Sequence, residues 1–298
     1  MKVLYHYDKG CNYRYLQKVL QRCQEMFSDF TFTLVRPSQY LEIDQNQFDI
    51  LIYQTFPDEH HSFKFDAEMI SRTDNKFSEF KGIKVLHDSH DNGELDAFSR
   101  MNNGASKLPR IKSMSSFSYL DRFNVILNTP PVFLGDTIAD LDDRKRDVPL
   151  HCCFSMGHYP HRLREDIWEI LKKDFSHVCN FKRIPMKGYR EFLRGTQMSV
   201  SAPGTGACSN GFYSMILCGT LAVHEKTLNN HQLLPFGTLM SGQDYVSFSI
   251  KTLKDTLNWL LKDPVSRDRI RMSGYRKLKE GHDIRRATVE FHKRLSEL

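Results

Sequence analysis

The strongest constraint on this 298-residue chain is a glycine-rich turn between two short apolar segments in its C-terminal half. Apolar residues alternate at 198–202, residues 203–206 are Pro-Gly-Thr-Gly, and residues 210–217 and 220–223 predict a helix and a second buried strand. This order forms one βαβ unit. A glycine turn lets the backbone approach a ligand, and the following helix N-terminus offers unpaired N–H groups to phosphate. The segment predicts an anion site, best matched by a nucleotide diphosphate. A tight turn that binds nothing is the alternative.

The remaining pattern predicts an α/β fold made of two Rossmann-like domains. In the first half, strands at 2–7, 31–35, 48–53, 82–87 and 125–127 alternate with helical stretches such as 13–27. In the second half, we expect strands at 151–156, 178–181 and 245–248, and helices at 163–174, 187–195, 253–262 and 284–298. A charged run at 140–147 predicts a solvated linker. We therefore expect domains at 1–146 and 147–283, followed by a C-terminal helix at 284–298.

Composition excludes several classes of protein. No apolar run reaches the ~20 residues of a membrane helix, and the N-terminus is too short and polar for a signal peptide. Seven scattered cysteines favour a reducing compartment, so we expect a cytoplasmic protein, and no zinc-site spacing is present. Residues 251–298 carry the whole net charge of +6. Such a basic segment suits phosphate, nucleic acid or a membrane surface, although a solvated helical surface is the favoured interpretation.

The glycine turn also carries a resemblance to a known family. Ser201-Ala202-Pro203-Gly204 and the Cys-Gly-Thr-Leu-Ala-Val run at 218–223 resemble the donor-binding core of GT-B glycosyltransferases, especially their exostosin-like and CgeB-like groups, with a viral or phage member as one interpretation. Gly211 and Ser214 stand where that pattern usually has Arg and Glu. The missing Glu argues against the retaining subgroup that uses two spaced glutamates.

The resemblance implies two domains facing a cleft, with the last helix crossing back to the first domain. The C-terminal domain would bind a nucleotide-diphosphate sugar as donor substrate, without a further cofactor, and the N-terminal domain would bind the acceptor. The expected reaction is sugar transfer to a glycan or other hydroxyl, with inversion. Two alternatives stay open, which are a DNA-modifying glycosyltransferase and a non-catalytic nucleotide- or carbohydrate-binding module.

A polar cluster in the N-terminal half predicts the general base. The sequence His-Asp-Ser-His-Asp-Asn-Gly at 87–93 follows a predicted strand, where ligands of open α/β sheets bind. It resembles an Asp-x-x-Asp element of this glycosyltransferase class, and we expect Asp91, then Asp88, to be catalytic. His87, His90 and Arg110 are expected to contact the acceptor, the last of them from a flexible basic loop. An ordinary turn with a helix cap is an equal alternative, and a metal site is a weaker one.

The expected donor-binding residues fall in three segments of the C-terminal half. Arginine can grip two phosphate oxygens, which favours Arg162, and next Arg164, after the turn at Gly157. Lys182 follows the next predicted strand, and Glu225 ends the strand after the glycine motif, where it would bind sugar hydroxyls or form a surface turn. The glycine motif supplies the remaining set, which is Pro203, Gly204, Thr205, Gly206, Ser209, Asn210 and Tyr213.

Overall fold

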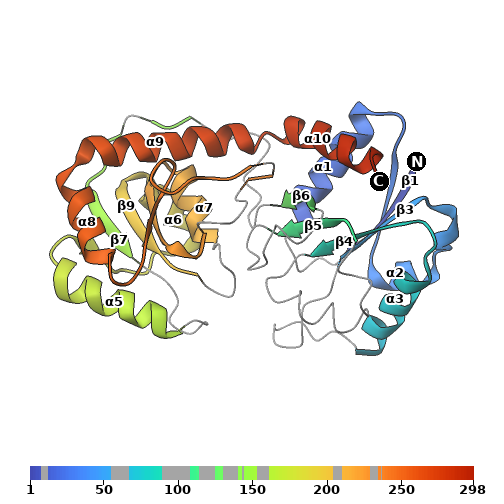
Figure 1. Cartoon of the computed structure of the whole chain (residues 1–298), viewed down its shortest axis with the longest axis horizontal. Coiled ribbons are helices and arrows are strands. Elements are labelled where there is room, and N and C mark those ends of the chain that lie inside the picture. Colours follow the sequence, from blue (N-terminus) through green and yellow to red (C-terminus); the bar gives the residue numbers. More distant parts are fainter. Residues whose placement is uncertain are drawn as a thin grey trace. The chain divides into compact units, whose positions relative to one another are not determined.

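The computed structural model describes residues 1–7, 13–54, 67–88, 108–113, 125–129, 140–142, 144–152, 161–203, 210–228, 234–235 and 237–298. The chain divides into two compact units, of which one comprises Met1–Phe133 with Asp283–Leu298 and the other Leu134–His282 (Figure 1). The second unit thus begins before the linker at 140–147, which the charge pattern had assigned to the boundary. Within the described residues, no helix combines the length and the apolar character needed to span a bilayer.

The N-terminal unit contains a parallel six-stranded sheet in the order β2-β1-β3-β4-β5-β6. Its strands are β1 (Lys2–His6), β2 (Thr31–Val35), β3 (Ile50–Gln54), β4 (Ile83–Asp88), β5 (Arg110–Ser113) and β6 (Val125–Thr129). Its described helices are α1 (Tyr13–Met26), α2 (Pro37–Glu42), the 3-10 turn η1 (Gln45–Gln47), α3 (Ala67–Glu79) and α10 (Ile284–Ser296). All five residues of β3 are buried, as a strand covered by helices on both faces requires.

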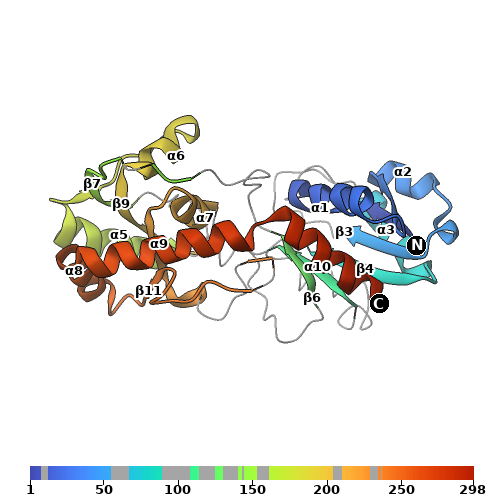
Figure 2. The ribbon, with the colours of Figure 1, turned by 90° about the horizontal axis from the view of Figure 1, so that it is seen from above.

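Two helical layers cover this sheet. Leu4, Leu51 and Leu86 pack with Phe77 of α3 and Tyr40 of α2 on one face. α10 packs on α1 and on β6, so the last helix of the chain belongs to the N-terminal unit (Figures 1 and 2). Its buried positions, which include Ile284, Ala287, Phe291 and Leu295, recur at the spacing of an amphipathic helix.

One expectation for this half is wrong. Residues 110–113 form strand β5 between β4 and β6, where we had expected a flexible loop. The segment has a single apolar residue, Ile111, but that side chain is fully buried. A strand this short gives almost no periodicity, and its neighbours in the sheet stabilise it through backbone hydrogen bonds rather than through its own composition.

The C-terminal unit contains a parallel five-stranded sheet in the order β11-β10-β9-β7-β8. Its strands are β7 (Val148–Cys152), β8 (Cys179–Asn180), β9 (Thr196–Ser201), β10 (Leu221–Glu225) and β11 (Val246–Phe248). Its described helices are α5 (His161–Phe175), α6 (Met186–Arg194), α7 (Asn210–Leu217), the 3-10 turn η4 (Lys226–Leu228), α8 (Leu253–Lys262) and α9 (Pro264–Gly281). β7 begins before the expected strand at 151–156 and ends at Cys152.

The two faces of this sheet differ in polarity. One face packs Leu150, Met198 and Leu221 against Ile167 of α5 and Leu257 of α8 in the main core of the unit. The opposite face carries His151, Ser199, Ser201 and His224, all buried, and the ring of His151 meets Phe192 of α6 edge to face. Polar side chains under a helical layer need partners or a function, because burial without a hydrogen bond is costly.

Candidate functional site

The strand order of the C-terminal unit locates its binding site. Numbered along the chain, the five strands lie in the order 2-1-3-4-5, and the connections diverge between β7 and β9. In sheets of this order, ligands bind beyond the carboxyl ends of the two strands at that switch point. The segment after β7 contains Gly157, and the segment after β9 contains the glycine motif. The two loops chosen from the sequence therefore start at neighbouring strand ends, although 153–160 and 204–209, and with them Gly157, Gly204, Thr205, Gly206 and Ser209, lie outside the described residues.

A buried arginine joins the two strand ends at the switch point. Arg164 lies in the first turn of α5, is 5% exposed, and donates from Nε to the carbonyl oxygen of Pro203 at 3.0 Å. α5 starts after the segment that follows β7, whereas Pro203 follows β9, so this bond fixes the plane of the peptide that leads out of β9. Arg164 thus acts on the backbone of the glycine motif, a role that the expectation of a direct phosphate contact did not include.

The electrostatic setting of Arg164 favours a bound anion. α5 and α7 both begin at the carboxyl end of the sheet, and neither has an acidic residue in its first turn. A helix N-terminus carries about +0.5 of a charge, so a cation in the first turn lies in unfavourable surroundings. Burial also lowers the pKa of Arg164 from its ordinary value, because desolvation disfavours the charged form. A negative group at this point would offset both effects.

The other described donor candidates lie on α5, on α7 and after β8, and their exposures differ. Arg162 is exposed in the first turn of α5, and Lys182 is exposed beyond β8, where its backbone N–H donates to Asn180 Oδ1 at 2.8 Å. Asn210 is the first residue of α7, and Tyr213 is fully buried in that helix beside Phe212. The burial of Tyr213 makes it part of the packing of α7, and its contact with a donor stays a prediction.

Glu225 lies at the carboxyl end of β10, next to the switch-point strands. It is 6% exposed, and its Oε2 accepts a hydrogen bond from the backbone N–H of Thr227 at 3.0 Å. The carboxylate of Glu225 thus closes a turn whose next residue, Lys226, is exposed, which agrees with the surface turn that was the alternative for Glu225. A contact between Glu225 and a sugar hydroxyl stays a prediction.

The sequence analysis did not select His151, which lies on the polar face near the end of β7. Its Nδ1–H donates to the carbonyl of Asn180 at 2.9 Å, and Nε2 is buried with no partner among the described residues. Burial lowers the pKa of His151, which keeps the imidazole neutral with Nε2 as an acceptor. Ser201 Oγ, at the end of β9, is buried in the same way. The sequence indications of this polar row were a histidine at the start of a predicted strand and the serines that alternate with apolar residues at 198–202.

In the N-terminal unit, β4 brings the first residues of the predicted catalytic cluster to the carboxyl edge of the sheet. His87 is fully buried, and its Nδ1 shares a 2.8 Å hydrogen bond with the hydroxyl of Tyr5 on β1. The ring of Tyr5 also stacks on Tyr7, at 5.6 Å between centroids. His87 is therefore placed to fix the end of β4 rather than to meet an acceptor at the surface, and its acceptor contact stays a prediction.

Asp88, the last residue of β4, pairs through its backbone with Lys112 of β5. Arg110 is the first residue of β5 and pairs with Leu86, so it lies on the strand next to β4 but further from the carboxyl edge of the sheet than Asp88 does. Asp91 and His90 lie outside the described residues. Among the described residues, no three His, Cys, Asp or Glu side chains gather in a way that could hold a metal ion.

Comparison with solved structures identifies the fold. No family model and no curated protein matches the sequence. The structure of Anabaena HepE in complex with UDP matches with a TM-score of 0.60 and 10% identity, over 100% of both chains. An alpha-glucosyltransferase in complex with UDP and a 13-mer DNA containing an HMU base matches with 0.55 and 12%, over 100% of this chain and 99% of that one. Sucrose-phosphate synthase from Thermosynechococcus elongatus matches with 0.59 and 8%, over 100% and 98%.

The chain has the GT-B fold. The two positions at which its sequence departs from the resembling GT-B pattern both lie in α7, with Gly211 in the first turn and Ser214 one turn later. Ser214 is 8% exposed and lies among buried residues of that helix. At these two positions α7 of this GT-B chain supplies neither a guanidinium nor a carboxylate, so any charged contact to a donor must come from other elements.

Proposed function

We propose that the chain is a glycosyltransferase, which moves a sugar from a nucleotide-diphosphate sugar to a glycan or another hydroxyl. The observation that carries the proposal is the switch point of the C-terminal unit, where buried Arg164 binds the Pro203 carbonyl between two helix N-termini without an acidic residue in their first turns. A diphosphate suits this point because helix N-termini direct N–H groups and a positive partial charge toward a ligand. The GT-B fold, which HepE has in its complex with UDP, supports the choice of a nucleotide.

On the donor side, we assign Arg162 to the diphosphate, because it is the exposed arginine of the first turn of α5. Gly157, the backbone of Gly204, Thr205 and Gly206, and the polar groups of Ser209, Asn210 and Tyr213 would complete the phosphate contacts, with Lys182 beyond β8. Glu225 Oε1 would accept a sugar hydroxyl. Cationic and N–H groups stabilise the negative charge that grows on the leaving diphosphate, so the reaction needs no bound metal in this scheme.

On the acceptor side, we assign Asp91 as the general base and Asp88 as the second candidate. The acceptor oxygen attacks the anomeric carbon, its proton passes to the carboxylate, and the bond from that carbon to the diphosphate breaks with its electron pair on phosphate. Attack from the face opposite the leaving group inverts the anomeric centre. His90 and Arg110 would contact the acceptor, and His87 would fix the end of β4 through Tyr5.

The first experiment separates an enzyme from a binding module. UDP-, GDP-, ADP- and CMP-sugars are screened by thermal shift, because a specific donor raises apparent stability by mass action. Sugar release from the stabilising donor is then measured for the native chain and for Asp91→Asn, which should retain the shift and lose ~10²–10⁴-fold in rate. A shift without turnover in the native chain would identify a non-catalytic module, and the anomeric configuration of the product would decide inversion.

A DNA acceptor is the second candidate, and two observations favour it. Residues 251–298 carry an excess of six positive charges, and one protein of the same fold is an alpha-glucosyltransferase in complex with DNA. Retention on DNA at low salt, lost as salt rises, would support this acceptor. We also propose a cytoplasmic location, since Cys23, Cys179 and Cys218 are buried free thiols, as a reducing compartment allows.

A further inference from the structure

The N-terminal sheet ends in a strand whose outer edge is free within the described part of the chain. β2 is the last strand of the sheet and pairs on its inner side with β1. The Thr31 N–H donates to Met1 O at 2.9 Å, and Val35 O accepts from the Tyr7 N–H at 3.0 Å, so these residues direct their backbone groups inward. Because direction alternates along a strand, Phe32 and Leu34 direct their N–H and C=O groups outward.

β2 lacks the features that usually protect an edge strand. Its sequence, Thr-Phe-Thr-Leu-Val, contains no charge, no proline and no glycine, and every residue except Leu34 is of a type that favours β-structure. Leu34 is 37% exposed, which is high for an aliphatic side chain. The strand is therefore competent to pair with a further strand.

A groove of about 600 Å³ runs beside this edge. Phe32 and Leu34 of β2 line it together with Leu20 and four polar residues of α1, of which Glu25 alone is charged. Glu25 is already bound to Gln21 at 3.0 Å and to Arg22 at 3.2 Å. The groove is thus apolar at its floor and nearly neutral at its rim, which suits a neutral, apolar occupant.

We propose that β2 pairs antiparallel with β2 of a second copy of this chain, about a two-fold axis at Thr33. Phe32 would then lie opposite Leu34 of the second copy, and Leu34 opposite Phe32. In an antiparallel ladder, the residues that direct their backbone groups toward the partner exchange two hydrogen bonds per pair. The two pairs satisfy all the outward groups of Phe32 and Leu34 in both copies.

The side chains agree with this register. Thr33 meets Thr33 of the second copy in the close pair between the two hydrogen-bonded ones, with Cα atoms about 4.5 Å apart. Two threonines are a favourable cross-strand pair, whereas two charges there would repel. On the other face, Phe32 and Leu34 of the two copies come together beside both grooves. A two-fold interface requires such self-complementarity, which selects a second copy over an unrelated strand.

The test is the molar mass of the full chain in solution. Light scattering with size exclusion should give twice the mass of the chain for the native protein. Leu34→Pro removes one outward N–H and leaves the inward bonds of β2 intact, as proline at a sheet edge allows. It should give a single-chain mass with an unchanged circular dichroism spectrum.

Leu34→Glu should also give a single-chain mass, because it places an unpaired carboxylate beside Phe32 of the second copy. The matched control is Val289→Glu on α10, which changes another exposed aliphatic residue of the same unit and should keep the double mass. A native chain of single mass, or a Leu34→Pro variant that folds and keeps the double mass, would overturn the proposal. Neither outcome depends on whether the chain transfers sugar.

Discussion

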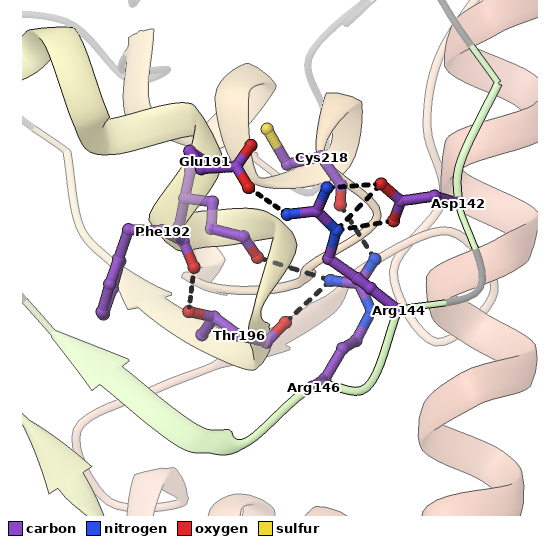
Figure 3. Close-up of polar contacts among 8 residues, drawn as sticks. Asp142, Arg144, Arg146, Glu191, Phe192, Thr196 and Cys218 are labelled. Carbon is purple, nitrogen blue, oxygen red and sulfur yellow. Dashed lines mark hydrogen bonds and ion pairs between the residues drawn. The ribbon is translucent and has the colours of Figure 1, made fainter.

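Two arginines lie at opposite ends of the C-terminal sheet, and their surroundings differ in sign. Arg146, before β7, donates to the carbonyls of Thr196 and Cys218, each at 3.0 Å, and to Leu193 O at 3.4 Å (Figure 3). Arg164, at the carboxyl end, donates to the carbonyl of Pro203. Burial lowers the pKa of both, that of Arg146 to about 10. The same residue type is therefore desolvated at both ends of one sheet.

The direction of the neighbouring helices explains why the surroundings of Arg146 and Arg164 differ. α6 and α7 end beside Arg146, whose partners Leu193 and Cys218 are carbonyls at those C-termini. Helix C-termini carry unpaired carbonyls and a partial negative charge, so a cation there is satisfied by the fold alone. α5 and α7 begin at the Arg164 end, where the partial charge is positive. The fold places Arg146 in negative surroundings, whereas the N-termini of α5 and α7 place Arg164 in positive surroundings, which favour a bound anion.

The largest expected effect is the loss of Arg146. Arg146→Met removes the donor shared by three backbone carbonyls, and we expect about 3–5 kcal/mol less stability, since hydrogen bonds to charged groups contribute about 1.5–3 kcal/mol each and are not additive. Urea unfolding followed by circular dichroism measures this change.

The neighbouring Arg144 is the control for this variant, since it is exposed and forms ion pairs with Asp142 and Glu191 (Figure 3). Arg144→Met should lower the unfolding midpoint far less than Arg146→Met. If both variants lose the same stability, the linker at 140–147 stabilises the unit through its exposed ion pairs and not through the buried guanidinium of Arg146.

The next effect concerns the backbone against which Arg146 packs. Gly219 has φ 66°, and an added Cβ would lie 2.5 Å from Leu141 Cδ1 and 2.8 Å from Arg146 Nη2. Gly219→Ala combines a left-handed conformation, which costs about 1–2 kcal/mol, with this overlap, so we expect about 2–3 kcal/mol less stability. The matched change Gly188→Ala in α6 meets no atom within 4 Å and should stabilise the chain by up to about 1 kcal/mol. An unchanged free energy of unfolding for Gly219→Ala would show that the side chains of Leu141 and Arg146 move to make room for the added methyl group.

The elements around Arg146 and Gly219 show which parts of the fold can be predicted from the sequence. The helix at 210–217 and the strand at 31–35 were predicted with the observed bounds, because both depend on local periodicity and turn residues. The linker at 140–147 was predicted to be solvated, yet Arg146 is half buried in it. Its partners lie about fifty and seventy residues further along the chain. Only the folded topology brings them together.

The candidate site divides in the same way. The glycine motif and Arg164 were chosen from local sequence, but the sheet order that makes them neighbours, β8-β7-β9, is a long-range property. His151 was not predicted as a site residue, because one imidazole in an apolar strand resembles a core residue. β5 was not predicted as a strand, because a single apolar residue, Ile111, gives no alternation of apolar and polar residues.

The third expected effect is the loss of Arg164, the arginine at the carboxyl end of the sheet. Arg164→Met should retain most of the stability, because the change removes a cation from the positive surroundings of two helix N-termini. The thermal shift produced by the donor should fall and the donor affinity should drop about tenfold, because the Pro203 peptide loses the hydrogen bond that orients it and the site loses a cation. Arg146→Met should show the reverse, a lower midpoint with the donor shift intact. If Arg164→Met unfolds as readily as Arg146→Met and still binds donor, the two ends of the sheet do not differ in function.

The smallest expected effect is at Glu225, which ends β10 and accepts a hydrogen bond from the turn that follows this strand. Glu225→Gln keeps an oxygen that can accept the Thr227 N–H, so stability should change by less than about 0.5 kcal/mol. A carboxylate binds a hydroxyl more strongly than an amide does by about 1 kcal/mol, so KM for the donor should rise about fivefold with kcat unchanged. Thr227→Ala leaves the backbone bond in place and should alter neither constant. An unchanged KM in Glu225→Gln would assign the carboxylate to the turn alone and leave ligand binding at this end of the sheet to β7 and β9.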